Sequence, residues 1–559
     1  MNPAEFEVKE NNNQLMTKFL PVFLVLFVIL FFFRLGSTGL IDVDEPRYAE
    51  AGREMLESGN WIVPYFNYHI RFDKPVFYYW LEAVSMKIFG VNEFAARLPS
   101  VLSALLCAYF VFYILKTFYG NVSGMLGALI LMSCFEFSSL SRFSVTDMTF
   151  SSFITCSLIC FFLGYNQLSA SHRFFKLQIS EFSLWYILAF VFLGLAFLTK
   201  GPVSVVIFIM VTIPFFWWIG KLEYFYRSHS FWIGAFVFFL FSLPWYVAVH
   251  IATSGEFTKV FFGFHNINRY TDVVSGHRGS VFYFFPVVLI GMLPWTFFLP
   301  QAINNIFGKK LKSLLISTAS QLPWFCLWWF IIIFLFFSFS KTKLLTYILP
   351  LFPPLAVVVS LWFMELLNKQ QRSLGLTLGL GIFFIFCLIV FYFCLFNLNS
   401  ILPREVKSLK LDLHIIYFAF LMLVGISMAW ASSNKNIEMT VFIILSTFLV
   451  LYYSFVGFLL PKIDRHAQFK LRKFATSFST DVKIGTYKII KPSLTFYSRR
   501  KIKKIDSSEK LQKIIDGDKK FAFVTKKKLL KEMNVVNVYK WGEDSRYVFF
   551  TNFPCHDHR

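Results

Sequence analysis

The sequence predicts a polytopic α-helical membrane protein with about 13 transmembrane helices and a small C-terminal soluble α/β domain. Three observations predict this fold class. Only 15% of the 559 residues are charged, whereas soluble domains carry roughly 25%. The chain is 57% hydrophobic, its mean hydropathy is +0.59, and apolar runs of membrane-spanning length recur along it. The composition changes to short apolar stretches and many lysines near Lys462. An ordinary soluble enzyme and a disordered chain are both excluded.

A bilayer span needs about 20 mostly apolar residues. The stretches that meet this requirement lie at about 19–40, 98–115, 117–135, 148–165, 183–198, 203–219, 230–252, 280–303, 319–339, 344–364, 374–396, 413–432 and 439–460. We predict that the first is a span and not a signal peptide, because no small-residue cleavage site follows its apolar run.

The loops predict the orientation of the spans. Short basic connectors on one face are typical of the cytoplasmic side. Long loops at about 41–97 and 251–279 lie on the other face, and their cations are accompanied by carboxylates and histidine. We therefore expect a cytoplasmic N-terminus, and external catalytic loops within a transmembrane domain formed by residues 1–461. An odd number of spans places residues 462–559 on the external side as well.

Residues 462–559 carry 24 Lys and Arg against 10 Asp and Glu, a net charge of +14, which leaves +8 for the rest of the chain. Strands at 482–490, 519–525, 535–541 and 546–552, with helices at 507–516 and 526–533, predict a partly parallel sheet. Basic groups beside a bilayer meet anionic headgroups at about 1 kcal/mol each. We therefore expect this domain to contact membrane lipids and no nucleic acid.

Three carboxylates, Asp42, Asp44 and Glu45, follow the first span within four residues. Acidic residues stabilise a helix N-terminus through the helix dipole, but capping alone needs only one of them. Charge at a membrane boundary is costly, so the cluster indicates a functional site. Arg47 lies three residues beyond Asp44, and helix geometry lets the two share one face, either in the site or as a surface ion pair.

Further charged residues stand at the ends of later spans. Lys74 follows Asp73 and precedes an aromatic run, so it is either a snorkelling interfacial lysine or a phosphate clamp. Asp147 lies in a very short connector, where it either caps the next span or faces Asp44 across one pocket. Lys200 interrupts two apolar runs, next to a Gly-Pro break that could simply mark a hairpin.

The last group of candidates lies in the second external loop and before a late span. His265 and Arg269 are four residues apart, which places them on one helix face. A single histidine is more often structural than a ligand, but the pair also suits anion or metal binding. Lys341 and Lys343 stand at the mouth of a span, with Tyr347 one turn inside it. Cations at membrane depth bind phosphate, and carboxylates beside them suit sugar hydroxyls, a metal or proton transfer. The set predicts an enzyme that acts on a lipid-linked phosphate.

Ordered motifs between about 40 and 360 resemble the lipid A aminoarabinose transferase family of the C-superfamily membrane glycosyltransferases, which is related to the protein O-mannosyltransferases. These motifs are DVDEPRYAEAGREMLESGNWIVPYF, RFDKPVFYYWLEA, RLPS, LTKGP, HNINR and KLLTYILPLFPPLA. The resemblance implies transfer of an amino sugar, aminoarabinose-like or a hexosamine, from undecaprenyl phosphate to a lipid A phosphate. It also implies a bacterial inner membrane protein whose catalytic face and C-terminal domain are periplasmic, and we expect a monomer.

The resemblance also implies roles for individual residues. Asp44 would be the central catalytic acid with Arg47 and Asp147 beside it. The donor phosphate would be held by Lys74, Arg269, Lys200, Lys341, Lys343 and Tyr347. Asp73 and His265 would bind a divalent metal, zinc or magnesium, although the family usually has EKPP where this chain has Asp73-Lys74-Pro75-Val76. The competing hypotheses are transfer of mannose or another hexose to protein or another glycan, and lipid transport or flipping.

Overall fold

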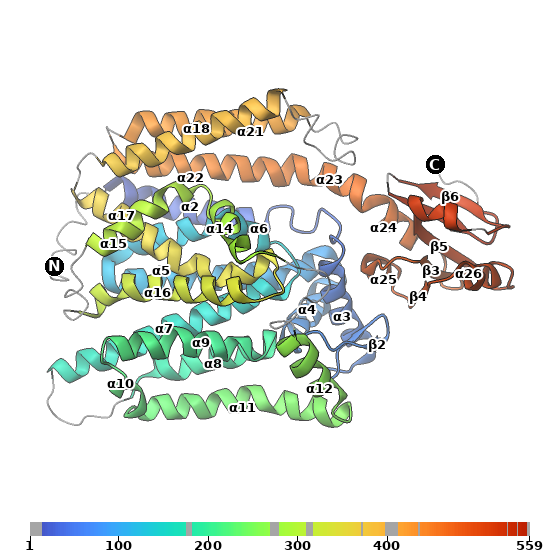
Figure 1. Cartoon of the computed structure of the whole chain (residues 1–559), viewed down its shortest axis with the longest axis horizontal. Coiled ribbons are helices and arrows are strands. Elements are labelled where there is room, and N and C mark those ends of the chain that lie inside the picture. Colours follow the sequence, from blue (N-terminus) through green and yellow to red (C-terminus); the bar gives the residue numbers. More distant parts are fainter. Residues whose placement is uncertain are drawn as a thin grey trace.

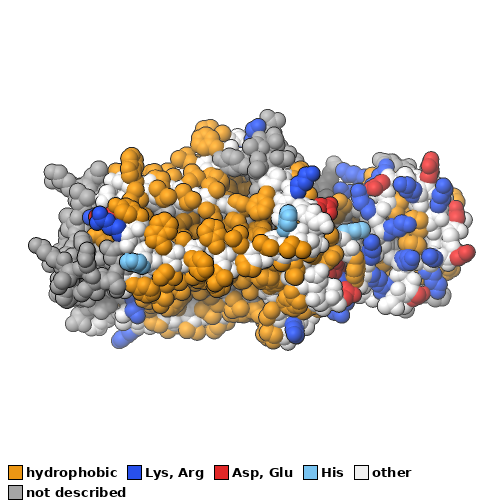
Figure 2. Space-filling model, turned by 90° about the horizontal axis from the view of Figure 1, so that it is seen from below, with side chains coloured by type: hydrophobic (Ala, Val, Ile, Leu, Met, Phe, Trp, Pro, Cys, Tyr) orange, Lys and Arg blue, Asp and Glu red, His pale blue; other side chains and the backbone are white. Residues whose placement is uncertain are grey.

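The computed structural model describes residues 14–174, 182–268, 279–308, 317–369, 373–396, 412–433, 436–533, 535–544 and 546–555. Figure 1 shows a long helical bundle with a small α/β domain attached to one of its ends. Seen from below, the bundle presents a broad hydrophobic surface, and charged side chains gather on the α/β domain (Figure 2). A bundle with an apolar exterior and a charged end domain is the expected form of a polytopic membrane protein.

The bundle helices each coincide with a predicted apolar stretch. They are α2 (Gln14–Phe32), α5 (Glu93–Met132), α7 (Thr146–Phe174), α8 (Leu184–Lys200), α9 (Val203–Trp218), α11 (His229–Ala252), α14 (Phe284–Gly291), α15 (Leu299–Gly308), α16 (Thr318–Phe339), α17 (Phe352–Lys369), α18 (Leu374–Phe396), α21 (Asp412–Ser433) and α22 (Ile437–Ser454). α5 contains two predicted spans, because it breaks at Gly120, where φ is 87°.

Within the described ranges, 8 helices are long and apolar enough to cross a bilayer. The count becomes 9 if the pair Val281–Gly291 and Trp295–Gly308, bent by 105°, is one span. Leu184–Lys200, Val203–Trp218 and Tyr417–Ala431 are apolar but shorter. The multi-pass architecture is confirmed, and the figure of thirteen spans stays a prediction.

Short elements cover the end of the bundle that faces the α/β domain. They are α3 (Asp44–Ser58), β1 (Tyr65–Phe66), β2 (His69–Ile70), α4 (Phe77–Phe89), α6 (Phe135–Leu140), α12 (Glu256–Phe262), the π-helical turn η2 (Gly263–Asn268), and the 3₁₀ turns η3 (Val281–Tyr283) and η6 (Leu345–Leu351). A further 3₁₀ turn, η4 (Trp295–Phe298), lies inside the bundle, at the bend between α14 and α15. A separate apolar cluster packs α3 and α4 against α11 and α12 through Tyr48, Tyr79, Trp245 and Phe257. The short helix α10 (Glu223–Tyr226) lies at the opposite end (Figure 1).

The C-terminal domain is built on a five-stranded mixed sheet with strand order β4-β3-β5-β7-β6. Its elements are α24 (Phe469–Thr476), β3 (Lys483–Tyr487), α25 (Pro492–Ser498), β4 (Ile502–Ile505), α26 (Ser508–Ile515), β5 (Phe521–Lys526), the 3₁₀ turn η8 (Lys527–Glu532), β6 (Tyr539–Glu543) and β7 (Tyr547–Thr551). β3 pairs in parallel with β4 and β5, and β7 runs antiparallel to β5 and β6. The predicted α/β domain with a partly parallel sheet is therefore confirmed.

The last membrane helix extends into the predicted soluble domain. The π-helical turn η7 (Phe455–Leu459) and α23 (Leu460–Ala467) continue α22, so the chain stays helical past residue 461.

The strand β4 is not predicted from the sequence, because its residues IKKI include only two apolar side chains, on either side of two exposed lysines. β4 is an edge strand of the sheet, and lysines on an edge strand discourage pairing with another chain.

Candidate active site

The structure separates the three carboxylates that follow the first span. Asp42 turns toward the C-terminal domain and accepts a hydrogen bond from the backbone N–H of Ser493 at 2.9 Å. Glu45 is buried and turns into the bundle. Asp44, in the first turn of α3, is the exposed member of the three. Of this cluster, Asp44 is thus the carboxylate that is available to a substrate.

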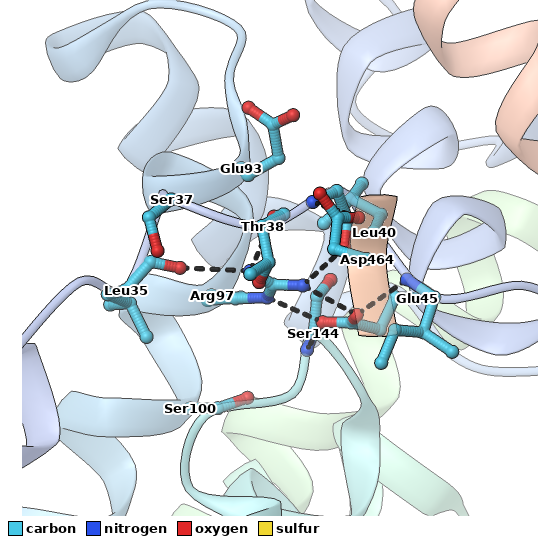
Figure 3. A network of polar contacts seen from close by, with 12 residues as sticks. Leu35, Ser37, Thr38, Leu40, Glu45, Glu93, Arg97, Ser100, Ser144 and Asp464 are labelled. Atoms are coloured by element: carbon cyan, nitrogen blue, oxygen red, sulfur yellow. Dashed lines mark hydrogen bonds and ion pairs between the residues drawn. The ribbon is translucent and has the colours of Figure 1, made fainter. Parts of the chain in front are cut away.

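Glu45 forms a bidentate ion pair with Arg97, with Nε–Oε1 at 2.8 Å and Nη2–Oε2 at 2.9 Å. Arg97 also donates to the carbonyls of Leu35, Thr38 and Gly39, each at 2.9 Å (Figure 3). This arginine ties the end of the first span to the start of α3. Sequence reasoning did not single it out, although one arginine at the start of a long apolar helix requires a carboxylate or carbonyl partners.

Asp147, Lys200 and Tyr347 come together from three separate helical segments. The Nζ of Lys200 lies 2.6 Å from Oδ1 of Asp147, and both side chains are mostly buried. The same Nζ lies 5.4 Å from the centre of the Tyr347 ring and 4.8 Å from that of Phe150, within the range of cation–π attraction. Asp147 thus lies in the first turn of α7, and its ion-pair partner is Lys200.

The Lys-Gly-Pro motif determines the position of Lys200 at the end of α8. Lys200 is the last residue of α8, and Gly201 has a φ of 81°, which L side chains rarely adopt. A Cβ on Gly201 would also lie 2.6 Å from Cζ of Phe261. Glycine is therefore required here, and it ends the helix with Lys200 directed at Asp147.

Asp44 and Asp147 both act electrostatically on the buried phenol of Tyr48. Burial raises the pKa of Tyr48, the charge of Arg71 lowers it, and the charges of Asp147 and Asp44 raise it further. Both carboxylates are therefore close enough to Tyr48 to affect its ionisation. The structure thus brings the exposed Asp44 and the Asp147–Lys200 pair to one region.

Asp73, Lys74 and His265 extend this region toward the second external loop. His265 Nε2 lies 3.3 Å from Asp73 Oδ1, and Lys74 acts electrostatically on both Asp73 and Asp147. Burial opposes ionisation of Asp73, but the surrounding positive charges, Arg71 foremost, hold its pKa below the ordinary value. Arg47 contributes to this effect, whereas the described residues include no Asp44–Arg47 ion pair.

Arg71 is a further buried cation that the sequence reasoning missed. Its guanidinium lies 4.7 Å from the ring centre of Tyr48 and 5.4 Å from that of Tyr79. It donates to the backbone carbonyl of Arg47 and pairs with Asp73, with Nε–Oδ2 at 3.4 Å. Arg71 therefore holds the Asp73 carboxylate against α3. Tyr79 belongs to the aromatic run after Lys74, so this run could have indicated a cation–π partner for Arg71.

The structure does not support a phosphate-binding role for Lys343. Lys343 is buried, and its Nζ donates to the carbonyls of Phe337, Ser338 and Ser340 at 3.3, 2.8 and 2.7 Å. An ammonium group has three N–H donors, so these carbonyls use all of them. The lysine caps the C-terminal end of α16, where positive charge is favourable.

We expect Lys343→Met to destabilise the protein by about 1 to 3 kcal/mol, because carbonyls at the end of α16 lose a charged donor. Thermal unfolding in detergent measures the loss, and undecaprenyl phosphate binding should not change. Lys341→Met is the control for stability alone, because Lys341 is exposed. A weaker affinity for undecaprenyl phosphate at unchanged stability would restore the phosphate-binding assignment to Lys343.

Two other predicted phosphate ligands have less structural support. Lys341 lies exposed between α16 and η6, at the mouth of the span as expected. Arg269 lies outside the residues that the structure describes. Neither assignment is tested by the geometry.

Asp73 and His265 fit a shared divalent ion by distance. Tetrahedral zinc with bonds of about 2.0–2.1 Å places two ligand atoms about 3.3 Å apart, which is the His265–Asp73 separation. The same distance also suits a direct ion pair. In the described part of the chain, no group of three or more His, Cys, Asp or Glu residues gathers around a possible metal position. Water and a donor phosphate would therefore have to complete the coordination.

Comparisons with known proteins bear on the fold and the family resemblance of the chain. Residues 16–257 match the family described as dolichyl-phosphate-mannose-protein mannosyltransferase. The whole chain has the fold of ArnT from Cupriavidus metallidurans, seen in a crystal structure bound to undecaprenyl phosphate. The TM-score is 0.81 at 22% identity, over 96% of this chain and 98% of that one. These findings show that the chain is a polytopic membrane protein with the ArnT fold.

Two proteins with similar sequences are named as aminoarabinose transferases. The undecaprenyl phosphate-α-4-amino-4-deoxy-L-arabinose arabinosyl transferase of Shewanella sediminis is 33% identical over 63% of this chain and 61% of its own length. Transferase 2 of Proteus mirabilis is 33% identical over 64% and 62%. The matched region spans less than two thirds of either relative. Over this matched region the chain is similar to the aminoarabinose transferases, so the resemblance predicted from its motifs is confirmed.

Proposed function

We propose that this protein transfers an amino sugar, aminoarabinose-like or a hexosamine, from undecaprenyl phosphate to a phosphate group of lipid A. The observation that carries the proposal is the position of Asp44. It is exposed at the end of the bundle, in one region with Lys74 and the Asp147–Lys200 pair. Carboxylates and cations at this depth suit a sugar that is linked to a phosphate and a lipid.

We further propose that the protein is an inner membrane protein whose site and C-terminal domain face the periplasm. The external loops and the C-terminal domain lie at the same end of the bundle (Figure 1). Lipid A phosphates are accessible on that side of the membrane. A monomer is sufficient for this function, because the described site residues come from one chain.

In the proposed reaction, an acceptor phosphate oxygen attacks the anomeric carbon, and the bond from that carbon to the donor phosphate oxygen breaks. Direct displacement inverts the anomeric centre. A phosphate acceptor is already ionised near neutral pH, so it needs no general base. The carboxylate of Asp44 would instead orient the sugar and stabilise the positive charge that develops on it.

The leaving polyprenyl phosphate gains negative charge as the bond breaks. Lys74 is positioned to stabilise that charge, since it lies in the field of Asp73 and Asp147 at the same rim. Lys200 is paired with Asp147, so it can bind phosphate only by sharing its charge with that carboxylate. If a divalent ion is present, Asp73 and His265 would hold it, and it would supply further charge neutralisation at the phosphate.

A basic cleft supports an anionic lipid as acceptor. The cleft, of about 560 Å³, lies between residues 91–93 of the membrane domain and helices α24 and α25. Arg472, Lys473 and Arg499 line it together with one carboxylate, Glu93, which pairs with Arg472 at 3.2 Å. Cations in excess at the membrane boundary attract phosphorylated headgroups.

Mass spectrometry of lipid A tests the proposed function. Lipid A from cells that make the protein should gain the mass of one amino sugar per modified phosphate, and cells without it should not. Unmodified lipid A in both strains would exclude this acceptor. The match to the mannosyltransferase family favours one alternative, transfer of a hexose to protein. That reaction would add the sugar mass to proteins and leave lipid A unchanged.

We expect Lys74→Ala to weaken undecaprenyl phosphate binding about 10- to 100-fold, because one charge-assisted contact to phosphate contributes about 1.5 to 3 kcal/mol. Lys87→Ala is the matched control, since Lys87 is an exposed lysine in the last turn of α4. Binding is measured with the purified protein and undecaprenyl phosphate. Equal affinities in the two variants would show that Lys74 does not contact the phosphate.

We expect bound metal to depend on His265 if the Asp73–His265 pair is a metal site. Elemental analysis of purified protein should then find zinc or magnesium in the wild type and less than half of it in His265→Ala. His250→Ala is the control, because His250 instead contacts the Thr258 hydroxyl at 2.7 Å. A wild type without metal, or an unchanged content in His265→Ala, would leave the pair as a direct ion pair.

A further inference from the structure

The segment that leads into α3 is held by the C-terminal domain. Gly39 donates its N–H to Asp464 Oδ1 at 2.9 Å, and Leu40 donates its N–H to the Tyr497 hydroxyl at 2.8 Å. Asp42 then accepts hydrogen bonds from the backbone N–H and the hydroxyl of Ser493. Asp464 belongs to α23, which continues the last membrane helix. Leu40 and Asp42 therefore contact the C-terminal domain directly, and Gly39 contacts the helix that leads into it.

The Asp42 contact is well formed and enclosed. Its side chain is only 4% exposed, and Lys491 Nζ lies 3.5 Å from its Oδ2. Beside it, Phe496 packs into an apolar cluster with Leu40 and Ala49 of the membrane domain. A carboxylate that accepts several hydrogen bonds and faces a lysine fixes its own backbone tightly.

The opposite side of the same segment is fixed by the bundle. Arg97 donates to the carbonyl of Gly39, and Glu45 accepts the N–H of Ile41 at 2.8 Å. The segment 39–45 is thus held both by Arg97 of the bundle and by the C-terminal domain. Asp44 lies two residues from Asp42, so a shift of Asp42 moves Asp44 directly.

We propose that the C-terminal domain positions Asp44 for the reaction through Asp42 and Ser493. This role goes beyond the lipid contact that the sequence predicts for the domain, and it rests on the proposed function of Asp44. Asp42 and Ser493 are positioning residues, because they contact the segment that carries Asp44 and not the substrate. Misplacing a catalytic group by about 1 Å can slow a reaction about 100-fold. Contacts that fix the backbone beside Asp44 can therefore affect the rate of transfer.

The test uses Ser493→Ala in the full-length protein, which removes the hydroxyl donor to Asp42. We expect hydrogen exchange of residues 40–44 to become at least 10-fold faster, and kcat to fall about 10-fold. The affinity for undecaprenyl phosphate and the KM of the acceptor should stay within a factor of two. Ser493→Thr, which keeps the hydroxyl, should restore both exchange and kcat.

Asn67→Gly is the matched control for a loosened domain interface. Asn67 exchanges two hydrogen bonds with the backbone of Ile502, at 3.0 and 2.7 Å, and its φ of 54° suits glycine. This variant should leave exchange at 40–44 and kcat near the wild type.

Three results would overturn the proposal: unchanged exchange at 40–44 in Ser493→Ala, a change in acceptor KM alone, or equal effects of Ser493→Ala and Asn67→Gly. A wild type without transferase activity would instead refute the proposed function. The exchange measurement would still decide whether Ser493 holds the Asp44 segment.

Discussion

The Asp44→Asn variant is expected to lose sugar transfer by about 10²- to 10³-fold, the usual cost of removing one electrostatic contact to a transition state. The carboxylate is exposed, so the amide leaves no buried group unpaired. Its place in the first turn of α3 makes the stability loss small, about 0.3 to 1 kcal/mol from the helix dipole. Transfer rates of purified protein, with undecaprenyl-phosphate-linked amino sugar and lipid A, measure the effect.

Glu57→Gln provides the control for this experiment. Glu57 lies on the same helix, is about half exposed, and pairs with Arg53 at 2.7 Å. The same change from carboxylate to amide should there leave transfer unaffected. A folded Asp44→Asn protein that transfers sugar at the wild-type rate would remove Asp44 from the reaction and leave Asp147 as the next candidate.

The membrane architecture could be predicted from sequence because hydropathy is a local property. Every bundle helix overlaps a predicted apolar run, although the break in α5 at Gly120 falls inside the predicted stretch 117–135. The strand β4 could not be predicted in this way. Its four residues form a strand because β3 supplies the pairing partner, with Ile484 opposite Ile502.

The sequence could predict which charged residues lie near the candidate site. It could not predict which of them contact the protein and which are available to a substrate. Asp42, Asp44 and Glu45 are indistinguishable by spacing alone. They differ because their partners, Ser493 and Arg97, come from distant parts of the chain. The separation depends on tertiary contacts that no local pattern records.

The same limitation explains the error for Lys343. It lies two residues from Lys341, and both stand at the mouth of one span. Lys343 turns back onto the end of α16, because the last carbonyls of a helix lack intrahelical donors. Sequence spacing gives the depth of a lysine in the membrane, whereas the direction of its side chain depends on which carbonyls are unpaired.

Replacement of Arg97 is expected to cause the largest loss of stability. Arg97→Met removes the partner of the buried Glu45 and leaves the carbonyls of Leu35, Thr38 and Gly39 without a donor. Breaking a buried ion pair by removing one partner costs about 3 to 5 kcal/mol, because an uncompensated charge remains. We expect little folded protein in the membrane, and a strongly lowered melting temperature for whatever can be purified.

A double variant separates the effect of the buried ion pair from that of the hydrogen bonds to the three carbonyls. Glu45→Gln keeps an acceptor for the N–H of Ile41 but removes the buried negative charge. Arg97→Met combined with Glu45→Gln should therefore be more stable than Arg97→Met alone, although still less stable than the wild type. Melting temperatures of the wild type, both single variants and the double variant complete a thermodynamic cycle. Losses that simply add would mean that Arg97 acts through the three carbonyls, and that its pairing with Glu45 contributes little to the fold.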